Sequence, residues 1–469
     1  MRNILVVRPY YGANISGDMH GDYGVIEYFN QTFPDLSLIT GVTILNQQNY
    51  NVTFIDANAE KLYPDEIVKR MAGNYHQIII KAAYATIRLD IEFAKCLKKL
   101  FPESKIIMTG RAATFLNKWL RRFVKEVDQV SLIRTEDYLN QLAGEKQKIL
   151  SLDEFPTLDY SLSPYKQYVS CGGELRATLY TSRGCIHNCD YCPYVALYDG
   201  RCEVRSLDKL INDIEAILSL GFKKIQFRDQ YFSCNKARTL AICNLIKERK
   251  LKFNWVCETR IDKLDKETID AMIEAGMEMI CFGVETASEK MLKNYHRPVP
   301  DIKKSKDIIQ YINENGSSTL AFYILGFPNE SWQDMKDTYD LASELGATHA
   351  SFNIWTPFMG TKSGIDYTGN DEISIDSFPV LKNYLDNNYA NEINTDMTEF
   401  VLNFLNNSYV FQMKGLKTLY QDHYQIETTK KLILSGYQRS KAFFRSILGE
   451  SSLNTDFTIE NGEILDEII

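Results

Sequence analysis

The sequence lacks the features that mark membrane and secreted proteins. No apolar run reaches the roughly 18 residues that a membrane-spanning helix needs. The first residues, MRNILVVRPYYG, hold one early arginine and a short apolar run without a small-residue cleavage site, so we expect a buried first strand rather than a secretory signal. These two absences predict a cytoplasmic protein without a membrane span.

An excess of positive charge is absent too. The chain has 53 Lys and Arg against 61 Asp and Glu, which gives a net charge of −8. No general electrostatic attraction to nucleic acid or to an anionic membrane is therefore expected. What the chain does have is apolar content, because 45% of its 469 residues are hydrophobic. This is enough for the cores of roughly two or three domains.

Cysteine is sparse, and this excludes a disulfide scaffold. Ten cysteines are spread over 469 residues. Seven of them stand alone along the chain, and we expect most of these to be buried apolar thiols. The other three, Cys185, Cys189 and Cys192, lie within eight residues in the stretch TSRGCIHNCDYCPY. Only this group indicates a metal site.

The first third of the chain has the pattern of an α/β domain. Over residues 1–145, short apolar runs alternate with amphipathic stretches, and the runs are NILVV, NVTFIDA, QIIIKAA and KIIMTG. Such runs are typical of buried strands in a parallel sheet. We therefore predict a doubly wound, Rossmann-like domain that binds ligands at the carboxyl ends of its strands. Residues 146–172 contain two prolines and no sustained period, which predicts a linker.

The strand–helix rhythm returns after the linker and then stops. Six apolar runs alternate with amphipathic helical stretches: ATLYTS, KIQFRD, FNWVCE, MICFGV, TLAFYIL and ASFNIW. This predicts a partial (β/α)6 barrel over residues 173–365, with its active site at the carboxyl ends of the strands. Helical patterns dominate from residue 366 to residue 469, so we expect a helical C-terminal region there.

Three clustered cysteines suit one kind of metal site better than another. A structural zinc ion takes four ligands, and Cys171, Cys202 or His187 could supply the fourth, but none of them completes a pair of C-x2-C motifs. A [4Fe–4S] cluster held by three cysteines leaves one iron without a protein ligand. That iron is free to bind a small molecule and to pass it an electron. The residues alone favour the cluster and leave zinc as an alternative.

The surrounding motifs resemble those of the radical S-adenosylmethionine (SAM) superfamily. The C-x3-C-x2-C spacing with Tyr191 before the last cysteine is similar to its cluster motif, and six further stretches resemble it at the expected strand ends: TSRGC, IQFRDQYF, WVCETRID, GMEMICFGVETAS, YILGFPNES and TPFMGT. The resemblance covers roughly residues 145–365. It is greatest to the branch with an N-terminal cobalamin-binding domain, which includes methyltransferases and the cyclase of bacteriochlorophyll synthesis. In this superfamily the free iron binds the methionine end of SAM, and reductive cleavage of SAM yields a 5′-deoxyadenosyl radical.

The resemblance implies a role for individual residues and partners. It makes Cys185, Cys189 and Cys192 the cluster ligands. Tyr191 would lie near the adenine, Asp229 near the methionine amine, and the backbone of Gly326 close to the cofactor. Arg260 and Glu285 would face SAM, the alternative being a structural ion pair between them. The resemblance also implies a small-molecule substrate and an electron donor such as flavodoxin or ferredoxin.

The reaction that follows hydrogen abstraction is open at this stage. The branch usually has paired glycines near KIIMTGRAATF, which let the backbone approach the nucleotide tail of the corrin, whereas here Thr109 and Arg111 flank the single Gly110. The domain therefore either binds cobalamin through altered contacts or is a retained scaffold. The first option implies cobalamin-dependent C-methylation. The second implies radical dehydration, epimerisation or cyclisation of a polar metabolite such as an amino sugar, with Cys234 or Cys257 as a hydrogen donor. A non-catalytic zinc-binding protein is the remote alternative.

Overall fold

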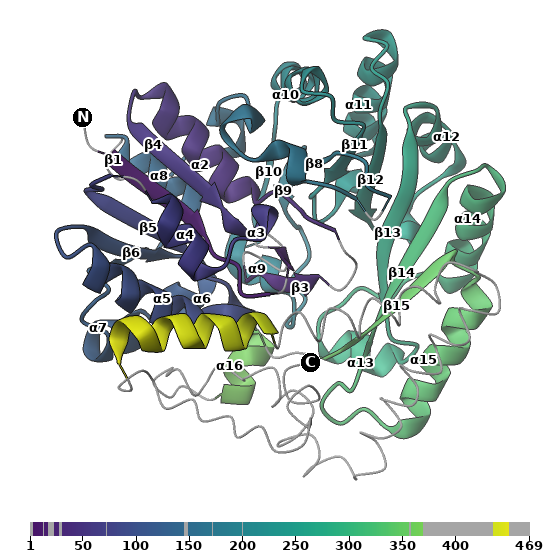
Figure 1. Cartoon of the computed structure of the whole chain (residues 1–469). Coiled ribbons are helices and arrows are strands. Elements are labelled where there is room, and N and C mark those ends of the chain that lie inside the picture. The colour runs from purple at the N-terminus through teal and green to yellow at the C-terminus, as the bar shows by residue number, and fades with distance from the viewer. Residues whose placement is uncertain are drawn as a thin grey trace.

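Two parallel sheets organise the chain. The structure is a computed structural model that describes residues 3–12, 14–16, 23–27, 31–71, 73–144, 149–170, 172–198, 200–355, 358–368 and 435–449. Within these residues the strands form one sheet of five, one of six and two short two-stranded sheets. Figure 1 shows the five-stranded sheet in purple and blue on one side and the six-stranded sheet in teal and green on the other. The domain boundaries at residues 145, 172 and 365 stay predictions.

The first sheet confirms the predicted doubly wound domain. Its order is β4-β1-β5-β6-β7 and all its pairs are parallel. The order reverses between β1 and β5, and in such sheets ligands bind at this switch point. The strands are β1 (Asn3–Arg8), β4 (Asn51–Asp56), β5 (Gln77–Lys81), β6 (Lys105–Thr109) and β7 (Gln129–Val130).

Both faces of the first sheet are covered, which explains why its strands are continuous apolar runs. Ile4 and Val6 of β1 pack under α2 and α8, whereas Leu5 and Val7 belong to the core on the other face. Asp35 caps α2 by accepting a hydrogen bond from the backbone N–H of Leu38. The helices are α2 (Leu36–Gln47), α3 (Ala57–Glu60), α4 (Pro64–Arg70), α5 (Ile87–Leu100), α6 (Arg111–Phe115), α7 (Asn117–Phe123) and α8 (Thr135–Leu142).

Short elements join the two sheets. The antiparallel pair of β2 (Asn14–Ser16) and β3 (Val25–Glu27) follows β1. In its described residues, the predicted linker forms the 3₁₀ turns η2 (Leu152–Glu154), η3 (Tyr160–Leu162) and η4 (Tyr165–Gln167), and Val169 makes an isolated bridge to Leu175. It is nevertheless held tightly, because the buried Arg205 donates hydrogen bonds to the backbone carbonyls of Leu152, Phe155 and Pro156.

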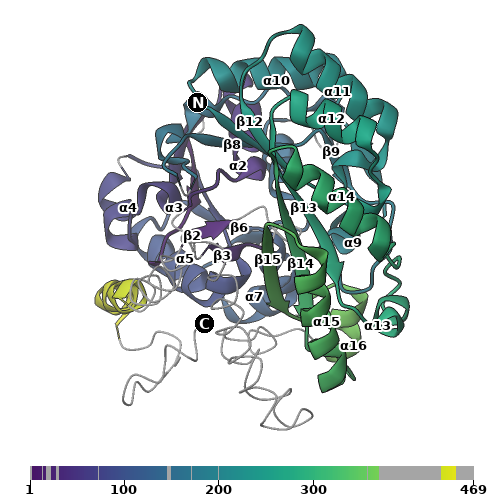
Figure 2. The ribbon, with the colours of Figure 1, turned by 90° about the vertical axis from the view of Figure 1, so that its right-hand side faces the viewer.

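The second sheet confirms the predicted partial barrel. Its order is β8-β11-β12-β13-β14-β15, and all its pairs are parallel. Figure 2 shows its helices on the outside of the strands. The strands are β8 (Arg176–Leu179), β11 (Lys224–Phe227), β12 (Asn254–Thr259), β13 (Met277–Glu285), β14 (Ser318–Leu325) and β15 (His349–Ile354). The helices are α10 (Leu207–Ser219), α11 (Lys236–Glu248), α12 (Lys266–Glu274), α13 (Glu289–Asn294), α14 (Ile302–Glu314), α15 (Trp332–Leu345) and α16 (Lys362–Thr368).

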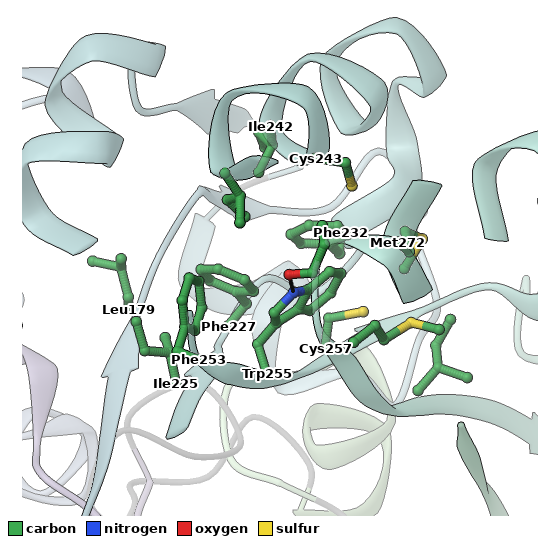
Figure 3. Close-up of a cluster of buried hydrophobic side chains, with 14 of the residues drawn as sticks. Leu179, Ile225, Phe227, Phe232, Ile242, Cys243, Phe253, Trp255, Cys257 and Met272 are labelled. Carbon is green, nitrogen blue, oxygen red and sulfur yellow. Dashed lines mark hydrogen bonds between the residues drawn. The ribbon is translucent and has the colours of Figure 1, made fainter. Parts of the chain in front are cut away.

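The largest apolar core lies between this sheet and its helices. Phe227 and Trp255 point from the strands into that layer, together with the thiol of Cys257 (Figure 3). Cys257 is fully buried there, on the outer face of the sheet. The hypothesis that Cys257 donates hydrogen at the active site is therefore wrong, because its side chain faces away from the barrel interior.

A helix from the C-terminal region covers the first domain. It spans residues 435–448, and its Phe444 is buried against Phe93 and Tyr11 (Figure 1, yellow). This helix agrees with the helical C-terminal region predicted from residue 366 onward. Residues 369–434 and 450–469 lie outside the described residues. In the described part of the chain, no helix is long and apolar enough to cross a membrane.

Candidate functional site

The three clustered cysteines lie at the carboxyl end of β8. The chain leaves β8, forms β9 (Ser182–Gly184), passes through the cysteine loop of residues 185–192 and enters α9 (Pro193–Tyr198). β9 pairs with β10 (Cys202–Val204) in an antiparallel hairpin. Gly184 has a φ of +90°, and a Cβ there would lie 1.8 Å from the carbonyl oxygen of Arg201. Only glycine fits at this position, which is the entrance to the loop.

Two side chains from the end of β11 hold the start of this loop. Asp229 is fully buried and accepts hydrogen bonds from the backbone N–H of Thr181 at 2.8 Å and of Ser182 at 2.8 Å. It also accepts one from each of their hydroxyls, both at 2.6 Å. Burial raises the pKa of Asp229 to about 6, against the lowering effect of these hydrogen bonds. Gln230 accepts a hydrogen bond from the backbone N–H of Gly184 at 2.6 Å.

The cysteines of the loop lie close enough to raise one another's pKa. Cys189 is buried, and Cys185 and Cys192 are half-buried. Burial raises the pKa of Cys192 to about 12, and the nearby Cys189 and Cys185 add to the effect. In the described residues, no three His, Cys, Asp or Glu side chains lie close enough to hold a single metal ion.

Tyr191 packs where the loop meets the ends of β13 and β14. Its ring makes edge contacts with Tyr295 and Phe327, at centroid distances of 6.1 and 5.7 Å. Burial raises its pKa well above the usual value, and the neighbouring Glu285 carboxylate adds to this. Tyr191 therefore lies beside Glu285, as the prediction of a common cofactor site requires.

Arg260 and Glu285 do not form the structural pair considered above. Arg260 is 5% exposed and pairs with Asp262 at 3.0 Å. Glu285 pairs instead with Arg297 at 3.1 Å, and burial raises its pKa although both arginines oppose the shift. Sequence reasoning missed Arg297, which follows α13 in the stretch KNYHRPVP.

Gly326 lies in a turn that a buried carboxylate holds. It has a φ of +81°, and its N–H donates to Glu330 at 2.5 Å. The N–H of Phe327 donates to the same oxygen at 2.9 Å, and Thr286 donates to the other oxygen at 3.4 Å. Burial raises the pKa of Glu330 to about 7. Glu330 was also missed, although the ESW sequence after Gly326 marks the start of a helix.

Asp190 ties the cysteine loop to the other side of the barrel. Its carboxylate contacts His296 Nδ1 at 3.0 Å and Lys362 Nζ at 2.6 Å. Its backbone N–H donates to the carbonyl of Tyr295 and its own carbonyl accepts from the N–H of Ser363. The loop is thus fixed to the end of α13 and to the start of α16.

A different thiol from those predicted faces the barrel interior. Burial raises the pKa of Cys281 and Glu258 adds to it, whereas Arg176 and Arg228 oppose the shift. Cys281 is paired in register with Glu258 of β12 and is absent from the outer core. Cys234, the other predicted donor, lies half-buried near Cys185, which raises its pKa in addition to the effect of burial.

Known proteins match this chain in sequence. The model of the radical SAM superfamily matches residues 179–342. An uncharacterized methyltransferase of Pyrococcus horikoshii is 30% identical over 359 residues, which are 71% of this chain and 78% of that protein.

Solved structures match it in fold. The radical SAM methyltransferase TsrM of Kitasatospora setae, solved with cobalamin and a [4Fe–4S] cluster, has a TM-score of 0.61 at 14% identity and covers 78% of this chain and 77% of its own. The cobalamin-dependent SAM radical enzyme OxsB, solved with aqua-cobalamin and SAM, has a TM-score of 0.58 at 17% identity and covers 81% of this chain and 56% of its own. At these identities the two structures establish the fold.

Proposed function

Because the chain belongs to the radical SAM superfamily, we propose that it cleaves SAM reductively and uses the resulting radical to methylate an unactivated carbon of a small molecule, with cobalamin as the methyl carrier. The main support is the placement of three mutually interacting thiols at the carboxyl edge of a partial barrel, beside Tyr191 and Glu285. The relative named as a methyltransferase and the fold shared with TsrM and OxsB support the choice of methyl transfer.

The thiols fit the role of cluster ligands. Cys185, Cys189 and Cys192 would hold a [4Fe–4S] cluster and leave one iron open. When bound, such a cluster supplies the electron that splits SAM into methionine and a 5′-deoxyadenosyl radical. The chain's own contribution is to fix the loop: Asp229 holds its first residues and Asp190 holds its far end. A loop held at both ends keeps the ligand geometry constant when the charge of the site changes.

The charged groups next to the loop fit the polar ends of SAM. Glu285 presents a carboxylate to a ribose hydroxyl or an amine, and Arg260 presents a guanidinium to a carboxylate. Both are buried, so they stay oriented and keep water away from the reacting centre. Gly326 adds a position without a side chain at the end of β14, while its N–H is already bound by Glu330.

The barrel interior supports a polar substrate. Glu258, Arg176 and Arg228 affect the pKa of the inward-facing Cys281, so charged side chains of both signs lie near the inner face of the sheet. An uncharged apolar molecule would bind poorly against this face, because the charged groups would lose polar partners. We therefore place the substrate among small polar metabolites.

The described residues offer little open space for cobalamin at the edge of the first sheet. A cavity of about 40 Å³ lies at the carboxyl edge between the two domains and is lined by Ser37 of α2, Glu136 of α8 and Arg183 of β9, among others. This volume holds a few water molecules and is too small for the nucleotide tail of a corrin.

Aromatic side chains occupy the other side of that edge. Tyr23 stacks on Phe115 at 6.0 Å and contacts Tyr84 at 5.8 Å and Phe358 at 5.1 Å. A Cβ on Gly110 would lie 2.4 Å from the carbonyl oxygen of Ala82, so this glycine is pressed against its own sheet. The rings around Tyr23 would have to move to admit the macrocycle on this side of the edge. This observation supports a second candidate, a cobalamin-independent radical dehydration, epimerisation or cyclisation.

The two candidates differ in their products. We expect the anaerobically reconstituted protein to hold about four irons and four sulfides per chain and to form 5′-deoxyadenosine from SAM and dithionite. Replacing Cys185, Cys189 and Cys192 together by alanine should abolish both, whereas Cys202→Ala, outside the loop on β10, should preserve them. S-adenosylhomocysteine formed alongside deoxyadenosine in the presence of methylcobalamin supports methyl transfer. Deoxyadenosine without S-adenosylhomocysteine supports the second candidate, and a full cluster without either product contradicts both.

A further inference from the structure

A short segment after β15 reaches into the first domain. It spans residues 358–363, and we call it the strap. Met359 is 2% exposed and belongs to the apolar core of the first domain. Its carbonyl accepts a hydrogen bond from the hydroxyl of Tyr23, whose side chain is fully buried. The ring of Phe358 lies 5.1 Å from the ring of Tyr23. The strap is thus bound to the first domain at its first two residues.

The middle of the strap is a stiff turn. Gly360 has a φ of +77°, and a Cβ there would collide with the ring of Phe115, so only glycine fits against the first domain. Thr361 directly precedes α16, and its hydroxyl accepts the N–H of Gly364 at 2.9 Å and donates to the carbonyl of Phe358 at 2.6 Å. A Cβ on Gly364 would collide with the same carbonyl oxygen. Because the turn is closed this tightly, a displacement of one end of the strap moves the other end.

The far end of the strap holds the cysteine loop. Lys362 Nζ contacts the carboxylate of Asp190 at 2.6 Å, and the N–H of Ser363 donates to the backbone carbonyl of Asp190 at 3.1 Å. Asp190 directly follows Cys189 in the loop, and its side chain is 8% exposed. The strap therefore connects the core of the first domain with the cysteine loop and contacts both.

A second contact from the first domain reaches the residues after the loop. Arg111 of α6 lies over the ring of Phe115, with its central carbon 4.8 Å from the ring centroid, and donates to the carbonyl of Ala196 in α9 at 3.4 Å. α9 begins directly after Cys192. Phe115 also stacks on Tyr23 at 6.0 Å. Both connections to the cysteine loop therefore start at the rings of Tyr23 and Phe115.

We propose that Tyr23 is a positioning residue for the cysteine loop, which it holds through the strap and Asp190. The first domain then serves the chemistry of the barrel without a ligand of its own, because it sets the place of the loop whose thiols would hold the cluster. The proposal rests on the proposed function for the use of the loop, whereas the connection is a property of the chain. A molecule that moves the ring of Tyr23 would loosen the loop as well.

The loss of a contact at either end of the strap should appear in the cysteine loop. Tyr23→Phe keeps the ring and removes the donor to Met359. Lys362→Gln removes the charge beside Asp190, and Lys362→Arg keeps it. We expect the amide hydrogen exchange of residues 185–192 to become about fivefold faster in Tyr23→Phe and in Lys362→Gln, which is the factor that one hydrogen bond contributes to an equilibrium. Lys362→Arg should exchange near the wild-type rate.

The measurement is hydrogen exchange followed by mass spectrometry on the full chain, with and without the reconstituted cluster. An iron chelator should also remove iron from reconstituted Tyr23→Phe faster than from wild type by a similar factor. Tyr168→Phe is the matched control, because Tyr168 is as fully buried as Tyr23 and its hydroxyl donates to Asp56 at 2.8 Å, at the end of β4. This variant should lose stability and leave the exchange of the loop unchanged.

A double variant separates one connection from two independent contacts. If Tyr23 and Lys362 act on the loop through the strap, Tyr23→Phe adds little once Lys362→Gln has broken the far contact. The exchange rate of the double variant should therefore stay well below the product of the two single effects. A double variant that reaches the full product overturns the inference, because the two residues then act on the loop independently.

The remaining outcomes are also decisive. Exchange of the loop at the wild-type rate in Tyr23→Phe overturns the inference and leaves the proposed function standing. Faster exchange with unchanged iron loss overturns it too, because the place of the loop would then not matter to the cluster. If Tyr23→Phe does not fold, Phe358→Leu removes the ring that packs on Tyr23 and is expected to give the same result. A wild-type chain that binds no cluster overturns the proposed function, and the exchange rates of the loop then decide the inference by themselves.

Discussion

Asp229 lies fully buried at the start of the cysteine loop, where the resemblance to the radical SAM superfamily places a group for the amine of SAM. Both of its oxygens are already engaged by Thr181 and Ser182. At the scale of the single residue, the two roles make different demands. A group that binds SAM needs a free oxygen facing the cofactor, whereas an anchor of the loop needs acceptors for two backbone N–H groups.

Replacing Asp229 by asparagine separates these roles. The amide keeps one acceptor oxygen and turns the other into an N–H₂ group that faces a backbone N–H, which costs about 1–3 kcal/mol. We expect Asp229→Asn to lose iron and sulfide on reconstitution. Asp213→Asn is the control: Asp213 is 1% exposed and pairs with Arg205 outside the loop, so this variant should lose stability but keep its iron. A full cluster with weakened SAM binding in Asp229→Asn would support the SAM role instead.

At the scale of the element, the turn between β14 and α15 depends on one carboxyl group. Glu330 accepts the N–H groups of Gly326 and Phe327 on one oxygen and the hydroxyl of Thr286 on the other. Glutamine reproduces all three contacts, since its oxygen accepts both N–H groups and its N–H₂ donates to Thr286. Glu330→Gln thus removes the charge and keeps the turn.

Because the pKa of Glu330 is raised, the effect of Glu330→Gln on the unfolding free energy depends on pH. The pKa is about 7 in the folded chain and about 4.3 in the unfolded chain. The stability that the protonated carboxyl contributes is therefore fully present below about pH 4 and is lost as the pH rises through 7. Between these values the unfolding free energy of Glu330→Gln should gain about 1.4 kcal/mol per pH unit relative to wild type. Urea unfolding of both proteins at pH 5, 6, 7 and 8 measures this.

A carboxylate with a lowered pKa serves as the control for the pH dependence of Glu330→Gln. Asp265, which caps α12, has a pKa lowered to about 2 because it accepts hydrogen bonds from Lys236 and Thr268. Asp265 is ionised in both states above pH 5, so Asp265→Asn should lose a constant amount of stability across the same range. If Glu330→Gln also differs from wild type by a constant amount, the pKa of Glu330 is not raised in the folded chain.

The elements could be predicted from the sequence because their signals are local. Each predicted apolar run forms a strand in the structure. The spacing of apolar residues that distinguishes a strand from a helix can be read within a short stretch of sequence. The direction of side chains in a doubly covered sheet could not be predicted. WVCET and MICFG are apolar on both faces, so nothing in the pattern tells that Cys257 points outward and Cys281 inward.

The parts of the site that depend on the spacing of residues along the sequence could be predicted. The contacts between side chains of different helices and strands could not. The cysteine spacing indicated the loop directly. Arg297 was missed because its place depends on a left-handed residue at the end of α13, and that residue is His296 instead of the glycine that marks such turns. The separate partners of Arg260 and Glu285 were missed as well, because Asp262 binds Arg260 and Arg297 reaches Glu285 from the end of α13.

At the scale of the whole molecule, a segment of the first domain that includes Phe33 packs against the edge of the second sheet. Phe33 is 5% exposed and lies between the guanidinium groups of Arg176 and Arg228, whose central carbons are 5.4 and 5.2 Å from the ring centroid. Around it, Arg228 donates to the hydroxyl of Ser16 at 3.0 Å. β8 is the edge strand of a six-stranded sheet that does not close. The segment therefore lies at the open edge of the sheet, where further strands would complete a closed barrel. Arg176 and Arg228 also face the barrel interior.

The contact at Phe33 should make the two domains unfold together. Phe33→Ala removes a buried ring at a cost of about 3–5 kcal/mol and leaves two guanidinium groups facing each other across the gap. We expect calorimetry to show two transitions in place of one, because the domains then lose the buried ring that joins the first domain to Arg176 and Arg228. Phe123→Ala is the matched control: Phe123 is 57% exposed on α7, so its loss should change stability by no more than about 0.5 kcal/mol. A single transition at the wild-type temperature in Phe33→Ala would mean that the domains are coupled elsewhere, and the cavity at the carboxyl edge, lined by residues of both domains, would then be the next interface to test.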